Sequence, residues 1–597
     1  MRIKNHKHLI SKDNILARKI TQGVGYLLLS GLLLAGCATT QGPATSDADS
    51  VSVKSSKPQT IADPKDISIG HPQSDLMYQI MLAELASQRG LNDVALKYYM
   101  NVLRQNKDPL IASRVVRIAS FIDANAEALE AAQIWAAGEP DNADARRILA
   151  VLYLRNGEFS AATEVLNKIL ADEPQNIDRS ILHIGMILQR EVPNEQAFQI
   201  ASQLIERHPK SAEGHYIVAT LAIDAQHTDE ALERVERTLE LRPDWTEAVV
   251  LRARVLQARG EQNLALSYLK KYLNRHPDEN EVRKLYARSL VDAQQLEEAR
   301  SQFELLAVKL PDDRDALFAL AMLSLQFKAY DEAEGYLLQL DRLGQRSPQL
   351  VYYLGQIKEQ KQAWAEALVW YEQVDQGEYF LDSQLRIAAV LARSQGLDEA
   401  IKHLRGLELE SKEDQRELMV FEAALLKEHK QYKEAIKVVN SIMGKFGKDP
   451  ELIYDRALLL ERVGKVDEAL RDLRFVVSEQ PENPSALNAL GYTLADRTQN
   501  YEEALIYVKK AIQLEPNDPA IMDSMGWVNF RMGNHEVALE YLQKAISVIF
   551  DGEVAAHLGE VLWSLGRQQE AKELWGKAKE KYSDNAILVE TMGRYLQ

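Results

Sequence analysis

The chain has 597 residues, of which 46% are apolar and 27% are charged, a composition typical of a folded protein rather than a disordered one. Its 71 basic and 88 acidic side chains give a formal charge of 71 − 88 = −17, which argues against binding nucleic acid through an overall positive field. The single cysteine, Cys37, excludes a disulfide within the chain and a thiolate cluster for zinc or iron–sulfur binding.

The first 36 residues contain the parts of a secretory signal. A stretch with six basic residues and one acidic residue precedes an apolar run at 24–34, which is short for a transmembrane helix. The sequence Leu34-Ala35-Gly36-Cys37 resembles the lipobox of bacterial lipoproteins. The resemblance implies cleavage before Cys37, followed by lipidation of its sulfur and its new N-terminus. The alternative is an uncleaved signal anchor with an incidental cysteine.

The lipoprotein resemblance also implies a location. Residue 38 is Ala, whereas Asp at this position is typical of retention in the inner membrane of Gram-negative bacteria. We therefore expect a lipid anchor in the outer membrane, with the protein facing the periplasm. Removal of residues 1–36 changes the formal charge to 65 − 87 = −22. Residues 37–75 are mostly small and polar and predict a lipidated flexible tether that spans roughly 35 Å.

A repeat of 34 residues runs through the rest of the chain. Apolar residues at three- and four-residue spacing predict helices and no strands. One alanine recurs every 33 to 35 residues: Ala95, Ala128, Ala162, Ala197, Ala231, Ala265, Ala299, Ala333, Ala367, Ala400, Ala435, Ala469, Ala504, Ala538 and Ala571. An Ala or Gly precedes it by twelve residues in nearly every repeat, which predicts a close crossing of two antiparallel helices. Glycines predict the turns between them, at Gly90, Gly157, Gly260, Gly396, Gly464, Gly533 and Gly566.

This helix–turn–helix pattern, with a proline near the end of many repeats, resembles the tetratricopeptide repeat. The resemblance covers residues 76–585 and implies an all-α fold, a right-handed superhelical solenoid of about fifteen repeats. Residues 586–597 predict a C-terminal capping helix. The four domains that the length alone suggests are thereby replaced by one solenoid.

No catalytic constellation is found in the sequence. His535-Glu536 lacks the second histidine of a zinc-binding helix, and no glycine-rich phosphate loop follows a strand. We expect no catalytic residue, no metal, no cofactor, no nucleic-acid partner and no small-molecule substrate. The chain is therefore expected not to be an enzyme, an expectation that rests partly on analogy with the repeat family.

Two groups of residues on first helices are candidate protein-binding surfaces. A stripe with helical spacing in the last three repeats predicts a concave peptide-docking groove made of Asn488, Tyr492, Asp523, Trp527, Phe530, His557 and Trp563. Packing between repeats is the alternative for these aromatic residues, and we prefer it for Trp135 and Trp575. A basic docking patch for an acidic partner or phospholipid headgroups is predicted from Arg114, Arg117, Arg147, Arg155, Arg179 and Arg190. The alternative for each arginine is a solvated face with salt bridges.

The last repeats have a narrower resemblance. Residues 488–497 read NALGYTLADR, and residues 520–528 read AIMDSMGWV. With the lipobox and the tether, they resemble the outer-membrane tetratricopeptide lipoproteins that partner a periplasmic carboxyl-terminal processing protease. This resemblance implies a non-catalytic adaptor that binds the protease and promotes degradation of cell-wall (peptidoglycan) hydrolases. The alternative is a scaffold lipoprotein for polysaccharide export or outer-membrane assembly.

Overall fold

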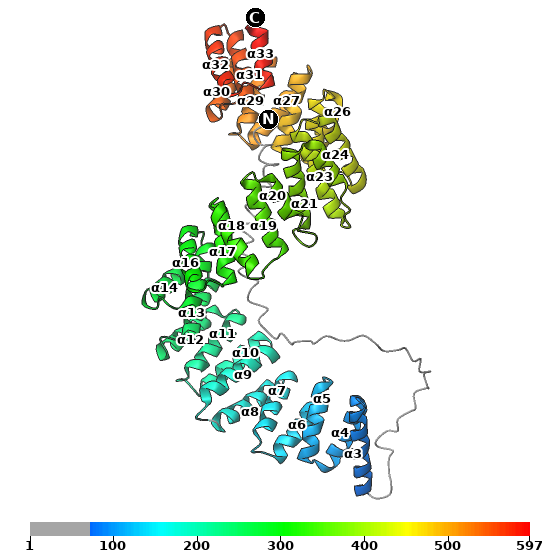
Figure 1. Ribbon diagram of the computed structural model, residues 1–597, viewed down its shortest axis with the longest axis vertical. Helices are drawn as coiled ribbons and strands as arrows, with labels where there is room; N and C mark the ends of the chain where they lie inside the picture. Colours follow the sequence, from blue (N-terminus) through cyan, green and yellow to red (C-terminus); the bar gives the residue numbers. More distant parts are fainter. Residues whose placement is uncertain (1–71, 173, 597) are drawn as a thin grey trace, which may run out of the picture. The chain divides into compact units, whose positions relative to one another are not determined.

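The computed structural model describes residues 72–172 and 174–596 (Figure 1). These residues form 31 helices and no strand, which confirms the predicted all-α tetratricopeptide solenoid. Fifteen helix pairs follow one another, and α33 (Ala586–Tyr595) follows the last pair. The first of the described helices begins at Pro72, a few residues before the expected start of the solenoid at 76. The predicted signal, Cys37 and most of the predicted tether lie outside the described residues.

The chain divides into two compact units, whose described parts are residues 72–316 and 317–596. In the first unit, the first helices of the repeats are α3 (Pro72–Gln88), α5 (Pro109–Phe121), α7 (Ala143–Arg155), α9 (Ile177–Glu191), α11 (Ala212–Asp224), α13 (Thr246–Ala258) and α15 (Asn280–Asp292). Their second helices are α4 (Asn92–Asn106), α6 (Asn125–Gly138), α8 (Phe159–Asp172), α10 (Asn194–Ile205), α12 (Thr228–Leu241), α14 (Gln262–Arg275) and α16 (Leu296–Lys309).

The boundary between the units falls within α17 (Arg314–Gln326). The other first helices of the second unit are α19 (Pro348–Gln360), α21 (Phe380–Ser394), α23 (Lys412–Glu428), α25 (Pro450–Arg462), α27 (Pro484–Arg497), α29 (Pro519–Arg531) and α31 (Gly552–Ser564). The second helices are α18 (Tyr330–Arg342), α20 (Trp364–Tyr371), α22 (Leu397–Arg405), α24 (Tyr432–Phe446), α26 (Val466–Glu479), α28 (Tyr501–Leu514), α30 (His535–Val548) and α32 (Gln568–Lys581).

The recurring small residues form the crossing points of the helix pairs. All fifteen alanines of the repeat series are fully buried. A Cβ atom added to Gly526 would lie 2.5 Å from Leu542 and 3.2 Å from the backbone oxygen of Ala538. The series in the first helices and the alanine series in the second helices therefore meet at the crossing, as the spacing predicts.

In thirteen of the fifteen described repeats, the turn between the two helices contains a residue with a positive φ. The seven glycines predicted at these turns have φ values between 70° and 109°. Six other repeats place a non-glycine residue at this position with a positive φ: Asp123, Gln226, Gln294, Lys328, Gln362 and Lys430. The turn geometry is therefore common to both groups, although glycine adopts it with less strain.

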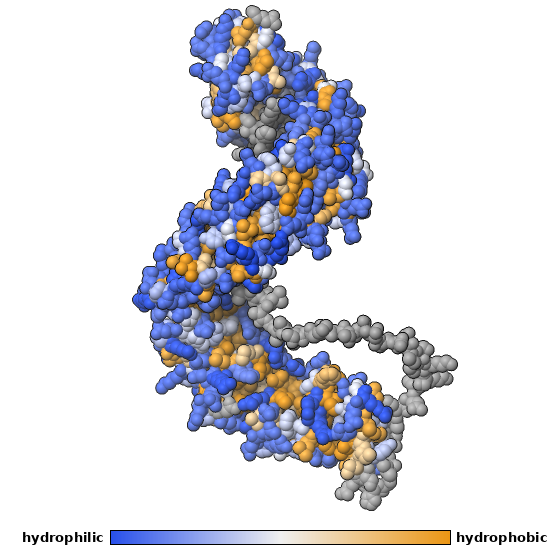
Figure 2. Space-filling model, in the orientation of Figure 1, coloured by the Kyte–Doolittle hydropathy of each residue, from blue (hydrophilic) through white to orange (hydrophobic). Residues whose placement is uncertain are grey.

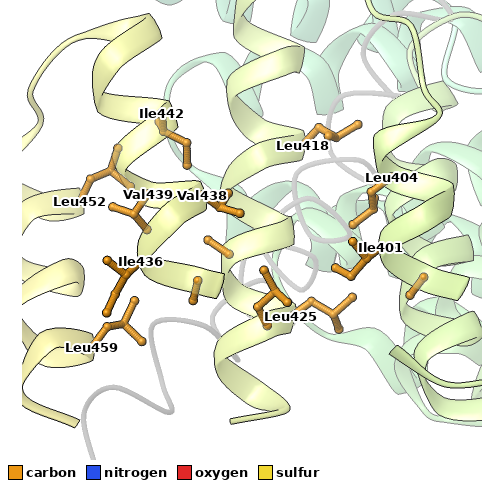
Figure 3. Packing of buried hydrophobic residues seen from close by; sticks show 14 of the residues in the cluster. Ile401, Leu404, Leu418, Leu425, Ile436, Val438, Val439, Ile442, Leu452 and Leu459 are labelled. Carbon is orange, nitrogen blue, oxygen red and sulfur yellow. The ribbon is translucent and has the colours of Figure 1, made fainter. Parts of the chain in front are cut away.

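The apolar core continues from one repeat to the next within each unit. In Figure 3, Ile401 and Leu404 of α22 face Leu418 and Leu425 of α23. The same cluster extends through α24 to Leu452 and Leu459 of α25. Each helix therefore packs against both its own partner and the adjacent repeat, which is the contact pattern of a solenoid.

Ion pairs link residues about one repeat apart. Many of these pairs involve partly exposed side chains, for which individual contributions to stability are small. Examples are Arg104–Glu130 at 2.7 Å, Arg155–Glu191 at 2.8 Å, Arg288–Asp315 at 2.8 Å, Arg474–Glu503 at 3.0 Å and Arg497–Glu461 at 2.6 Å.

Candidate protein-binding site

The first helices of the last three repeats bring most of the predicted groove residues together. Each helix has a side-chain cap at its N-terminus: Asn483 accepts the amide hydrogen of Ala486, and Asp518 accepts those of Ala520 and Ile521. Pro484 and Pro519 occupy the first helical positions, where a missing N–H costs no helical hydrogen bond. These caps fix where α27 and α29 begin and hence which side chains lie on the same face.

Trp527 and His557 form the centre of the cluster. Their rings stack with centroids 4.1 Å apart and an interplanar angle of 22°. The Nδ1 atom of His557 lies 3.0 Å from both carboxylate oxygens of Asp523. Burial alone would lower the pKa of His557, but Asp523, with Glu553 and Asp496, raises this pKa to about 9. The imidazolium is therefore the main form at neutral pH, and it ties α31 to α29.

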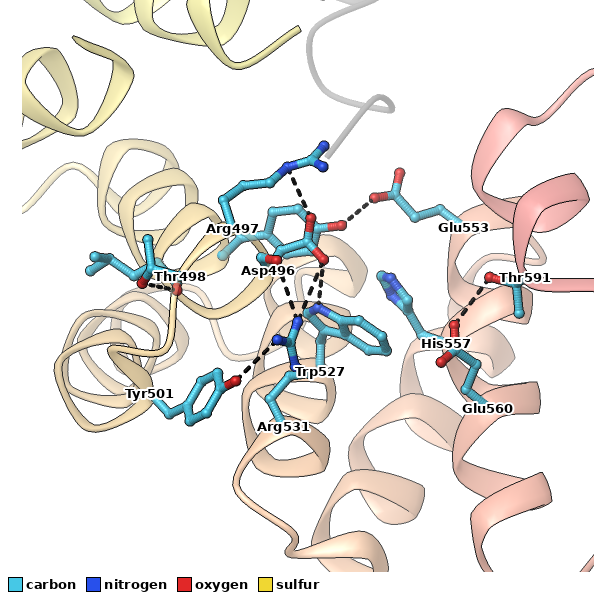
Figure 4. Close-up of polar contacts among 12 residues, drawn as sticks. Asp496, Arg497, Thr498, Tyr501, Trp527, Arg531, Glu553, His557, Glu560 and Thr591 are labelled. Atoms are coloured by element: carbon cyan, nitrogen blue, oxygen red, sulfur yellow. Dashed lines mark hydrogen bonds and ion pairs between the residues drawn. The ribbon is translucent and has the colours of Figure 1, made fainter. Parts of the chain in front are cut away.

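Asp496 joins the end of α27 to α29 (Figure 4). The indole N–H of Trp527 donates to Asp496 at 3.2 Å. Arg531 lies 4.0 Å from the same carboxylate and also donates to the hydroxyl of Tyr501 at 3.0 Å. Trp527 is thus held from one side by a carboxylate and from the other by an imidazole.

The remaining predicted groove residues have separate environments. Phe530 is half-buried, with its ring 5.4 Å from that of Trp527. The side-chain oxygen of Asn488 is buried and has no hydrogen-bond partner among the described residues. Trp563 instead packs against Trp575 at 5.8 Å and Tyr595 of α33 at 5.5 Å. The structure therefore places Trp563 in the packing of the last repeat and not beside Trp527.

Trp135 and Trp575, for which we prefer packing between repeats, lie where packing predicts. Trp575 is fully buried in the apolar cluster of the last repeats. Trp135 packs at the edge of the first cluster and donates to Glu139 at 3.0 Å.

A second polar cluster, missed from the sequence, lies on α19, α20 and α21. The buried carboxylate of Glu359 accepts a hydrogen bond from the phenol of Tyr371 at 2.9 Å. Arg386 and Arg393 reach the same carboxylate at 3.4 Å and 3.3 Å. Interaction with Glu359 outweighs the burial of Arg386, so the pKa of its guanidinium is raised. This cluster fixes the packing of three consecutive helices.

Most arginines of the predicted basic patch contact carboxylates. Ion pairs form between Arg114 and Glu84, Arg147 and Asp144, Arg155 and Glu191, and Arg190 and Glu191. Arg117 and Arg179 are exposed and make no ion pair with a described residue. The six arginines are therefore not a uniform set, and four of them have the salt-bridged environment that the sequence left as the alternative.

Comparison with known proteins identifies the family. Models of the tetratricopeptide repeat match residues 123–180, 286–348, 454–519 and 521–551. A TPR repeat-containing protein of Pseudomonas aeruginosa is 35% identical over 493 residues, which are 82% of this chain and 83% of that protein. The chain belongs to the tetratricopeptide-repeat proteins. Such repeats support a scaffold or adaptor role through protein binding, and the matched models indicate no catalytic family.

The solved structures that resemble this tetratricopeptide-repeat protein include the following three. A TPR protein of Thermus thermophilus is 22% identical, covering 30% of this chain and 100% of that chain, with a TM-score of 0.28. MamA of Desulfovibrio magneticus is 20% identical, covering 29% and 98%, with a TM-score of 0.25. A chain of the APC/C Cut9–Hcn1 hetero-tetramer is 13% identical, covering 90% and 98%, with a TM-score of 0.31.

Two residues of the site of this tetratricopeptide-repeat protein are absent from the sequence-based prediction. Asp496 and Glu553 contact the predicted residues but were not predicted with them. Both lie four residues from a predicted residue, since Asp496 follows Tyr492 and Glu553 precedes His557. Helical spacing could therefore have found them.

Among the described residues, no group of three or more His, Cys, Asp or Glu side chains is arranged to hold a metal ion. None of the helices in residues 72–596, residue 173 aside, is both long and apolar enough to cross a membrane.

Proposed function

We propose that this chain is a non-catalytic, lipid-anchored adaptor that binds a periplasmic carboxyl-terminal processing protease and promotes its degradation of peptidoglycan hydrolases. The observation that supports this proposal is the contact between the two segments of the resemblance. Residues 488–497 lie on α27 and residues 520–528 on α29, and Trp527 donates to Asp496 between them. An adaptor needs only surfaces that hold two proteins near each other, which raises their effective concentration.

The proposed location is the inner face of the outer membrane, through lipid on Cys37. Replacement Cys37→Ser removes the sulfur that would form the thioether. The variant is expected in the soluble periplasmic fraction, with the wild-type chain in the outer-membrane fraction. Equal membrane association of both proteins would contradict the lipid anchor.

A soluble chain that lacks residues 1–37 tests the adaptor role. It is expected to copurify with a processing protease and to accelerate proteolysis of a peptidoglycan hydrolase in a purified mixture. Absence of both effects would contradict the proposal. Crosslinking to a polysaccharide synthase or a porin instead would favour the scaffold alternative.

Variants of the cluster on α27 and α29 locate the surface involved. Asn488→Ala and Phe530→Ala remove a buried amide whose oxygen has no described partner and a half-buried ring. We expect these variants to weaken protease or substrate binding while helicity, measured by circular dichroism, is unchanged. Val537→Ala removes an exposed apolar side chain of the second helix α30, outside this cluster, and serves as the control.

A further inference from the structure

Large apolar side chains are exposed on few first helices. Among the described helix pairs, exposed large apolar residues on first helices occur only on α3, α5 and α9, whereas the others of these pairs lie on second helices or, for Leu91, in the turn after α3. The most exposed are Phe121 at 77%, Leu110 at 70%, Met77 at 62% and Met186 at 60%. Exposed apolar residues that gather in this way mark an interaction surface more often than scattered ones do.

These apolar residues alternate with arginines at equivalent positions of consecutive repeats. The residue directly after the small residue at the crossing is Arg117 on α5, Val151 on α7 and Met186 on α9. Four residues further on, the same helices have Phe121, Arg155 and Arg190. These six residues define a surface that we name the α5–α9 face. Figure 2 shows apolar and hydrophilic side chains interspersed over this part of the first unit.

In the repeats formed by α5 with α6 and by α7 with α8, most basic and most acidic residues lie on different helices. The sequences of α5 and α7 contain five arginines and one acidic residue, Asp144. The sequences of α6 and α8 contain four acidic residues and one lysine, Lys168. The first helices α5 and α7 are thus positive and their partners α6 and α8 negative, in a chain whose total charge is −17. The helix α9 has two arginines and two acidic residues and is balanced. This separation favours an acidic partner on the side of the first helices.

The ion pairs leave positive charge on the α5–α9 face. Arg155 and Arg190 share the single carboxylate of Glu191, at 2.8 Å and 2.7 Å. Hydrogen bonding to Arg155 outweighs burial and lowers the pKa of Glu191, so this carboxylate is ionised at neutral pH. Arg117 has no ion pair with a described residue. The face therefore has three guanidinium groups, of which two share the carboxylate of Glu191, and Asp123 adds a second negative charge near Arg155.

We propose that the α5–α9 face binds an acidic amphipathic helix of a partner protein. This inference rests on the proposed adaptor function and deepens it by naming the chemistry of one partner. Apolar residues of such a helix would cover Phe121 and Met186, and its carboxylates would pair with Arg117, Arg155 and Arg190. A lipid surface fits less well because the apolar residues are separated by charged ones and form no continuous apolar face.

Fluorescence anisotropy of a labelled amphipathic peptide tests the proposal. The probe is a Leu/Glu peptide of about 18 residues, or five helical turns, and its comparison is a Leu/Lys peptide of the same pattern. The protein is the whole chain without residues 1–37. We expect the Leu/Glu peptide to bind at least about tenfold more tightly than the Leu/Lys peptide, with an affinity that falls as salt rises.

Two variants of the α5–α9 face and one matched control complete the experiment. Phe121→Ser with Met186→Ser, and separately Arg117→Glu, are each expected to weaken binding of the Leu/Glu peptide about tenfold. The control, Leu264→Ser with Lys271→Glu, alters an exposed leucine and an exposed lysine on the second helix α14. It is expected to change affinity less than about twofold. Circular dichroism checks that every variant keeps its helicity.

Several results would overturn the proposal. Equal binding of the two peptides, or no binding of either, would exclude recognition of acidic helices. Binding of vesicles with anionic headgroups that depends on the same residues, without peptide binding, would assign the face to lipid. Self-association in sedimentation that these variants abolish would assign it to a second copy. The assay contains no protease, so its failure is distinct from failure of the protease pulldown.

Discussion

The phenol of Tyr492 donates a hydrogen bond to the carboxylate of Glu553 at 2.9 Å. The two residues are 61 positions apart, which places them on first helices two repeats from each other. Burial and the adjacent carboxylate raise the pKa of Tyr492 well above its usual value of 10, so the phenol stays protonated and donates. The bond spans α29, so we infer that the last three repeats are tied into one block.

Tyr492→Phe removes this bond and leaves the ring. A hydrogen bond to a charged group contributes about 1.5–3 kcal/mol, so we expect the free energy of unfolding of the last repeats to fall by about this amount. Urea denaturation followed by tryptophan fluorescence measures the change. Tyr507→Phe on α28 is the control, because its phenol has no hydrogen bond to a described residue. An equal change in the free energy of unfolding for both replacements would contradict the inference that the last three repeats form one block.

His557 makes the stability of the same repeats depend on pH. Its pKa is about 9 in the folded chain and about 6.5 in a free side chain. A pKa raised by folding adds stability that is fully present below pH 6.5 and is lost as pH rises through 9. The shift corresponds to roughly 3 kcal/mol, as an upper estimate.

Denaturation of the wild type at several pH values between 6 and 10 checks this expectation. His557→Gln removes the titrating group beside Asp523 and should flatten the decline above pH 6.5. A wild-type curve that rises over this range would contradict the assignment. Titration of groups that do not interact with His557 is common to both proteins and cancels in their difference.

The left-handed turns predict opposite effects of two substitutions. Gln294 has φ of 58°, and glycine adopts this region without the strain of a side chain. Gln294→Gly is therefore expected to stabilise the chain by up to about 1 kcal/mol. Gly533 has φ of 85°, and Gly533→Ala should destabilise by about 1 kcal/mol or more.

Thermal denaturation of these variants needs a control for the entropy of glycine itself. Gly576 lies within α32, with no atom within 4 Å of an added Cβ. Gly576→Ala should stabilise by about 0.5–1 kcal/mol, the opposite sign to Gly533→Ala. The same sign at both positions would contradict the role assigned to turn geometry.

Glu359, the single acidic residue of α19, is expected to be sensitive to substitution. Glu359→Gln keeps an acceptor for Tyr371 but leaves the largely buried Arg386 without its counter-ion. Loss of one partner from a buried ion pair should lower the free energy of unfolding by about 3 kcal/mol. The exposed pair Arg567–Glu570 provides the control, since Glu570→Gln should leave stability close to unchanged. Chemical denaturation compares the two variants.

The fold was predictable from sequence because the same pattern of small residues and turn residues recurs in nearly every repeat. Each crossing alanine is fully buried, and each predicted turn glycine has a positive φ. The site was predictable only in part. Helical spacing placed Tyr492, Trp527 and His557 on neighbouring first helices, and the structure brings them together.

The remaining site features depend on contacts that no local pattern contains. Trp563 has the same helical spacing as the other predicted aromatic residues, but its ring packs against Tyr595 of α33. The cluster around Glu359 joins residues from three helices, and the distance along the chain from Glu359 to Arg393 is 34 positions. The pairing of a buried carboxylate with two arginines is a property of packing, which the period of the repeat leaves undetermined.

The ion pairs between neighbouring repeats have a mechanical consequence. Because they are partly exposed, each can open and close at little cost, and opening one leaves the pairs at other joints intact. Within each compact unit, small rotations at several joints can add up to a large displacement without loss of the buried alanine crossings. Such a unit is an elastic body, and its stiffness should fall as rising salt screens the ion pairs.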